Sequence, residues 1–302
     1  MNEFNEKLNK LTAAGDLEAV EAFIKASIAE ESEDSQTRSA LRNTLAGFYR
    51  GVSRYAESAE EFARALEILE AVGMDTSPEY VTIQLNLAGL YRVMGQPDRA
   101  ADTLGLAMDK LGSAGQHESY SYVSVLNDLA FVYQDKGEYP TAIEYAEKVL
   151  EIVRAGAGGE SETALSLTNL ASLRLANNQL DIAENHINEA LAIYSDLSEP
   201  DAHQTAAIAI KAALLRHAGD YRGAIGRLRE ALELTGRFYG ENAEYAASLC
   251  SISEIYELLG DYANARTELC NAVSIMDRVP GAVNNKALAG MRDKLAGLAA
   301  AE

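Results

Sequence analysis

Histidine and cysteine are the side chains in this 302-residue sequence that would carry metal, nucleophilic or acid–base chemistry. The four histidines are His117, His186, His203 and His217. They lack the HExxH or ExxH spacing that places two metal ligands on one helix face, so we interpret them as surface or packing residues. Cys250 and Cys270 lie without metal-type spacing and are predicted to be reduced thiols packed on helices. We therefore expect no metal site and no cofactor.

Two other features could suggest catalysis. The glycine-rich stretch RAGAGGESE at 154–162 follows a helical pattern and lacks the Lys-Ser/Thr of a phosphate loop, so it predicts a helix stop. The 46 acidic residues are spread over polar faces, where chance pairs of carboxylates are common. We predict that the protein is not an enzyme, and an enzyme without a recognisable motif is the weaker alternative.

The charge and hydropathy of the chain narrow the classes of partner. A formal net charge of −20 opposes the phosphate neutralisation on which nucleic-acid binding depends, and it equally disfavours anionic membranes. The N-terminal MNEFNEKLNK lacks a signal-peptide pattern, and no apolar run is long enough for a transmembrane helix. We expect an ordered cytoplasmic protein that binds neither nucleic acid nor membrane.

Two stretches, LAGLYRVMGQPDRA from Leu87 and LAFVYQDKGEYPTA from Leu129, show that one pattern is repeated. A small residue follows the anchor Leu87, an aromatic residue comes four positions after it, and Gly95 comes eight positions after it. The same pattern recurs at intervals of 41 or 42 residues, with anchors at Leu45, Leu87, Leu129, Leu170, Lys211 and Ile252. The offsets of one and four mark one face of a helix, and the glycine suits the left-handed turn that ends it.

A second apolar stripe follows each turn and predicts a second helix packed antiparallel on the first. These second helices are expected to begin at Tyr55, Pro97, Tyr139, Leu180, Tyr221 and Tyr262. Because no alternating β-branched run occurs, we predict an all-α fold, a right-handed superhelical solenoid of antiparallel helix pairs.

The expected domain organisation has three parts. Residues 1–39 form a degenerate helix pair with a turn at Gly15 and a solvated acidic loop at 29–34, and residues 282–302 form a C-terminal capping helix. Between them lie six repeats over 40–281, at about 40–80, 81–122, 123–163, 164–204, 205–245 and 246–281.

These recurring positions resemble the tetratricopeptide repeat (TPR), through Ala88, Tyr91, Gly95, Ala100 and Ala107. The period of that family is about 34 residues, and the longer period here is similar to the kinesin-light-chain type of repeat. The linker LTGRFYGENAEYAASL at 234–249 supports this likeness, whereas Arg174 and Lys211 depart from the pattern. The resemblance implies an adaptor that holds a peptide or partner domain in a concave groove lined by the first helices.

If the anchors face the core, a neighbouring stripe of each first helix lines that groove. The predicted groove residues are Asn43, Gly47, Arg50, Asn86, Gly89, Arg92, Asn127, Phe131, Gln134, Asn169, Leu175, Arg216, Glu254 and Glu257. The asparagines form a ladder that could bind the backbone of an extended peptide; alternatively, they bond neighbouring repeats or water.

Other groove residues also leave alternatives open. A mid-helix glycine costs about 1 kcal/mol relative to alanine, so Gly47 and Gly89 indicate either close approach of a ligand or tight helix packing. Arg50 and Arg92 would suit a carboxylate or phosphate, or would form ordinary ion pairs. With acidic residues in the sixth repeat, the groove would run from basic through apolar to acidic and so orient a bound chain.

We predict a non-catalytic scaffold or adaptor that binds a protein or peptide. An alternative is a regulatory or peptide-sensing repeat protein that controls a separate effector, since the acidic N-terminal region disfavours DNA binding by this chain. Self-association through the ends of the array is a further prediction.

Overall fold

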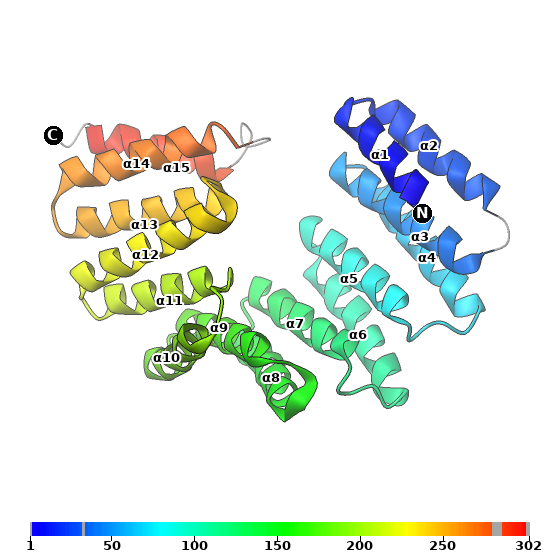
Figure 1. Cartoon of the computed structure of the whole chain (residues 1–302), viewed down its shortest axis with the longest axis horizontal. Helices are drawn as coiled ribbons and strands as arrows, with labels where there is room; N and C mark the ends of the chain where they lie inside the picture. Colours follow the sequence, from blue (N-terminus) through cyan, green and yellow to red (C-terminus); the bar gives the residue numbers. More distant parts are fainter. Residues whose placement is uncertain (1, 32–33, 280–285, 300–302) are drawn as a thin grey trace. The chain divides into compact units, whose positions relative to one another are not determined.

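Helices make up the secondary structure of residues 2–31, 34–279 and 286–299, which are the residues that the computed structural model describes (Figure 1). No strand occurs in these residues, so the all-α prediction is confirmed. The chain divides into two compact units, residues 1–152 (unit 1) and residues 153–302 (unit 2).

Unit 1 contains four helix pairs. Its helices are α1 (Asn2–Ala13), α2 (Leu17–Glu30), α3 (Ser35–Gly51), α4 (Tyr55–Ala71), α5 (Pro78–Val93), α6 (Pro97–Ser113), α7 (Tyr120–Asp135) and α8 (Tyr139–Ile152). Unit 2 opens with a short π-helical turn, η1 (Val153–Ala157). Its helices are α9 (Glu160–Ala176), α10 (Leu180–Asp196), α11 (Gln204–His217), α12 (Tyr221–Tyr239), α13 (Ala243–Leu258), α14 (Tyr262–Met276) and α15 (Lys286–Ala299).

Each repeat turns between its two helices at the residue that the pattern marks. Gly95, Gly137, Gly219 and Gly260 have φ between 67° and 80°, and Ser53 and Asn178 adopt the same left-handed conformation at 62° and 57°. Because glycine has no Cβ, it takes this conformation without steric cost. All six second helices begin at the predicted residues. The first helices begin one to five residues before the predicted repeat bounds, because N-caps such as Ser77 and Ser119 start them earlier.

The small residue after each anchor lies where the second helix of the same repeat presses close. Ala46, Ala88, Ala130, Ala171, Ala212 and Ser253 are all buried. In the first repeat the Ser58 hydroxyl donates a hydrogen bond of 2.7 Å to the carbonyl of Ala46. In the sixth repeat the Ser253 hydroxyl donates a bond of the same length to the carbonyl of Ala265. A larger side chain here would force the two helices apart.

The two departures from the repeat pattern are accommodated by polar partners. Lys211, in place of an apolar anchor, donates hydrogen bonds of 2.7 Å to Glu184 and 2.9 Å to Asn188 on α10. Arg174, in place of the aromatic residue, donates one of 2.6 Å to Gln179 in the turn that follows. The fourth and fifth repeats therefore keep the helix pair.

The terminal helices cover the ends of the two units. Val20 and Ile24 of α2 pack with Leu45 and Tyr49 of the first repeat. Leu298 of α15 packs against α14. The acidic loop was placed too early, because α2 continues to Glu30. Residues 32–33 of that loop, and residues 282–285 and 300–302 of the predicted capping helix, lie outside the described residues.

The predicted helix stop at 154–162 is observed. Helix α8 ends at Ile152, Gly156 has φ of 115°, and α9 begins at Glu160. The boundary between the two units falls at the start of this segment.

Candidate functional site: the first-helix faces

Within each unit the first helices of successive repeats contact one another, α3 with α5, α5 with α7, and α9 with α11. We call the surface that they form the first-helix face of that unit. The predicted groove residues all belong to first helices. On unit 1 they are Asn43, Gly47, Arg50, Asn86, Gly89, Arg92, Asn127, Phe131 and Gln134; on unit 2 they are Asn169, Leu175, Arg216, Glu254 and Glu257.

The asparagine ladder is partly self-bonded. Asn86 Nδ2 donates a hydrogen bond of 3.1 Å to Asn43 Oδ1, so this pair bonds neighbouring repeats. The second N–H of Asn86 and the amide N–H groups of Asn43 are still available to a ligand. At Asn43 and Asn86 the ladder is thus a contact between repeats, and its ligand-binding role stays a proposal.

The two mid-helix glycines leave open space rather than permitting tight helix packing. A Cβ added to Gly47 would meet no atom within 4 Å. A Cβ added to Gly89 would lie 3.7 Å from the Arg50 guanidinium, an ordinary contact. The helix-packing alternative for these glycines is therefore wrong, and the Arg50 side chain lies over the backbone of α5 at Gly89.

The two arginines of this face differ in their partners. Arg92 Nε donates a hydrogen bond of 2.6 Å to Asp135 Oδ2 on α7, within an ion pair, and its guanidinium lies 5.9 Å from the centre of the Phe131 ring. Arg50 is exposed and forms no ion pair within the described part of the chain. The predicted pair of equivalent free arginines is thus reduced to one free guanidinium, because α7 supplies a carboxylate to the other.

Apolar and acidic groups lie beside these arginines. Val93 is 61% exposed and Phe131 is 39% exposed. Asp128 is half-buried, and burial raises the pKa of its carboxyl group, with the Arg92 charge opposing that rise. The first-helix face of unit 1 therefore combines an arginine without an ion pair in the described residues, exposed apolar side chains and open backbone at Gly47.

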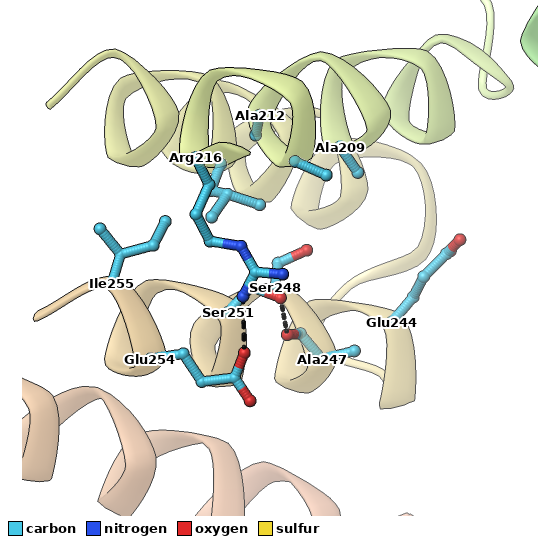
Figure 2. A pocket seen from close by; sticks show the side chains of 11 residues that line it. Ala209, Ala212, Arg216, Glu244, Ala247, Ser248, Ser251, Glu254 and Ile255 are labelled. Atoms are coloured by element: carbon cyan, nitrogen blue, oxygen red, sulfur yellow. Dashed lines mark hydrogen bonds and ion pairs between the residues drawn. The ribbon is translucent and has the colours of Figure 1, made fainter. Parts of the chain in front are cut away.

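The first-helix face of unit 2 holds a pocket of about 240 Å³ between α11 and α13 (Figure 2). Small side chains form much of its lining: Ala209, Ala212, Ala213, Ala247, Ser248 and Ser251. Arg216 Nη1 donates a hydrogen bond of 3.1 Å to Glu254 Oε2 at one end, and Glu244 lies toward the other. We call this feature the α11–α13 pocket.

The acidic residues predicted for the sixth repeat are largely neutralised. Lys294 of α15 forms ion pairs of 3.3 Å with Glu254 and 3.0 Å with Glu257. The sequence pattern missed Lys294 because this residue lies in the capping helix, outside the repeats. Asn169 and Leu175 are half-buried on α9 and do not line the pocket.

The thiols are free and dissimilar. Cys250 is half-buried, and burial raises its pKa to about 11. Cys270 is exposed on α14, so the prediction that both thiols are packed is wrong for this residue. Among the described residues no group of three or more His, Cys, Asp or Glu side chains could hold a metal ion.

The helix pairs and the repeated turn positions define an all-α repeat protein. A family profile matches most of its sequence. The profile described as tetratricopeptide repeat matches residues 36–110, 121–196 and 204–278, and the chain belongs to this family. None of the helices in the described residues has the length and apolarity needed to cross a lipid bilayer.

Solved structures show the same fold at low sequence identity. A tetratricopeptide repeat protein from Parabacteroides merdae is 18% identical, with 97% of each chain covered and a TM-score of 0.64. Apo RapI is 12% identical, with 91% of this chain and 74% of that chain covered and a TM-score of 0.70. A putative kinesin light chain from Podosopora anserina with TPR-like repeats is 22% identical, with 64% of this chain and 92% of that chain covered and a TM-score of 0.51. A search of curated proteins found no match.

Proposed function

We propose that this chain is a non-catalytic scaffold that binds extended segments of partner proteins on its first-helix faces. The observation that carries the proposal is Arg50, an exposed guanidinium without an ion pair in the described residues, held over Gly89 in a chain of net charge −20. An exposed guanidinium without an ion pair in the described residues, on the same helix as the open backbone at Gly47, suits an acidic ligand.

The neighbouring groups indicate what kind of segment fits unit 1. Gly47 lets a ligand backbone approach α3, and Gly89 leaves room over α5 for the Arg50 guanidinium. The amides of Asn43 and Asn86 keep donors for the carbonyl groups of the ligand. Exposed Val93 and Phe131 would bury an apolar side chain next to the acidic one. The proposed ligand is therefore an extended acidic–apolar segment, with its carboxylate on Arg50.

The proposal is tested by selecting binders from a displayed library of random twelve-residue peptides against the full chain. We expect peptides rich in Asp or Glu next to an apolar residue. Arg50→Glu should weaken their binding tenfold or more if the pair is desolvated, since breaking buried charge pairs costs about 2 to 5 kcal/mol.

A matched control is Arg222→Glu, which reverses an exposed arginine on the second helix α12 and should leave binding unchanged. The double substitution Gly47→Leu with Gly89→Leu should block the face without touching a charge. Selected peptides that bind Arg50→Glu and the double glycine variant as well as they bind the unaltered chain would place binding elsewhere and refute the proposal.

A further inference from the structure

The α11–α13 pocket has a chemistry different from that of the unit 1 face. Alanine side chains of α11, Ala209 and Ala213, line it together with Ala247 of α13. The absence of long side chains at these positions leaves a slot between two neighbouring first helices (Figure 2). The stem of a long, unbranched side chain can lie along such a methyl-lined slot.

The charges at the pocket balance except at one residue. Arg216 and Lys294 are matched by Glu254 and Glu257, with which they form ion pairs. Glu244 is exposed in the first turn of α13 and forms no ion pair in the described part of the chain. The pocket therefore carries an excess negative charge.

The hydroxyl groups of the pocket can accept hydrogen bonds. The Ser251 hydroxyl donates a hydrogen bond of 3.2 Å to the carbonyl of Ala247, so the lone pairs of its oxygen are available to a donor. Ser248 also lines the pocket and makes no side-chain hydrogen bond within the described residues. A donor-rich ligand group would thus find two hydroxyl oxygens and the Glu244 carboxylate.

Other occupants fit these groups less well. A carboxylate would have to compete with Glu254 for Arg216 while facing Glu244, so like charges would oppose it. An apolar side chain would cover the hydroxyl groups without offering them a donor.

We propose that the α11–α13 pocket binds the lysine or arginine side chain of a partner protein segment. The alkyl stem lies against the alanines, and the cationic head donates hydrogen bonds to Glu244 and to the serine hydroxyls. The inference rests on the proposed function only in taking the occupant from a partner protein, because the pocket and its charges belong to unit 2 alone.

The test uses the full chain labelled with ¹³C in its alanine methyl groups. The probes are acetyl-Ala-Ala-Lys-Ala-Ala-amide and the same peptide with Arg, Glu or Leu at the centre. We expect the Lys and Arg peptides to shift the methyl resonances of Ala209, Ala213 and Ala247 saturably. The Glu and Leu peptides should bind at least about tenfold more weakly.

Substitutions then test the pocket groups. Glu244→Gln should weaken the Lys peptide about two- to fivefold, the range of an exposed ion pair, and 0.5 M salt should reduce the difference. The control Glu233→Gln makes the same charge change at an exposed residue of α12 and should have no effect on binding of the Lys peptide. Ser248→Leu should fill the slot and abolish saturable shifts, with circular dichroism confirming that the variant folds.

Several outcomes would overturn the inference. These are equal binding of the Leu peptide, preference for the Glu peptide, or an unchanged affinity in Glu244→Gln. Binding of n-butylammonium as tight as that of the Lys peptide would indicate a small-amine site instead of a docking pocket. Arg50→Glu should not change the binding of the Lys peptide, so failure here is distinct from failure of the unit 1 proposal.

Discussion

Asn86 Nδ2 lies 3.1 Å from Asn43 Oδ1 and donates a hydrogen bond to it, although the two residues are 43 positions apart in the chain. They occupy nearly equivalent positions on α5 and α3, so one amide bonds the next across a repeat interface. The pair joins two neighbouring repeats, and its remaining N–H groups are the donors that we propose for ligand binding.

A double-mutant cycle should detect this bond. We expect Asn43→Ala and Asn86→Ala to show a coupling energy of about 0.5 to 1.5 kcal/mol in urea unfolding, the usual net contribution of one hydrogen bond. Replacing Asn127 and Asn43 together should give additive effects, because no bond joins these two side chains in the described structure. A coupling near zero for the first pair would show that water satisfies both amides in solution.

The helix-contact position of the third repeat should not tolerate a long charged side chain. Ala130 on α7 is buried at 5% exposure, so Ala130→Arg forces a guanidinium between packed helices. We expect a loss of several kcal/mol in the free energy of unfolding through overpacking and an unpaired buried charge. The control Ala63→Arg, at an exposed position on α4, should change it by less than about 0.5 kcal/mol.

The turn residues should respond in opposite directions to substitution. Ser53 has a left-handed φ of 62°, which glycine adopts more easily, so Ser53→Gly should stabilise the protein by about 0.5 to 1 kcal/mol. Gly137 has φ of 73°, and Gly137→Ala should destabilise by about 1 kcal/mol. Thermal unfolding of the two variants checks this, and shifts of the same sign would contradict it.

The contact between α2 and the first repeat should weaken in acid. Hydrogen bonds from Lys25 and Arg54 lower the pKa of Glu21 from its ordinary 4.5 to about 2. A carboxyl group with a lowered folded-state pKa contributes stability above its unfolded pKa, and this contribution is lost as pH falls from about 4.5 to 2.

Glu21→Gln should therefore lower the free energy of unfolding by about 1 kcal/mol at pH 7 and by much less at pH 2. The value at pH 7 is small because a partly exposed ion pair contributes little to stability. Urea unfolding at both pH values measures the difference. An equal effect of the substitution at both values would mean that the charge of Glu21 contributes nothing.

The two thiols should react at different rates. Cys270 is exposed, whereas Cys250 is half-buried with its pKa raised to about 11, which leaves little thiolate at pH 8. With a thiol-reactive disulfide reagent we expect one fast and one slow phase, and Cys270→Ala should remove the fast phase. A single phase that accounts for both thiols, or a fast phase that survives Cys270→Ala, would contradict this assignment.

The sequence by itself determined the repeating helix pair. The left-handed turn at Gly95, the buried small residue Ala88 and the start of the second helix at Pro97 all follow from local rules of backbone geometry and helical periodicity. Such rules involve residues close in the chain, so they recur in each repeat and can be recognised from a single sequence. They also placed the candidate groove residues on the first helices.

Tertiary structure alone decided which of those residues are free to bind. Arg92 is paired with Asp135, whereas Arg50 at the matching position has no ion pair in the described residues. Glu254 is shared between Arg216 and Lys294, which approaches from the capping helix. Such pairings depend on how neighbouring helices are rotated and which rotamers they allow. A long side chain reaches a partner some forty residues away, and helical periodicity carries no information about that reach.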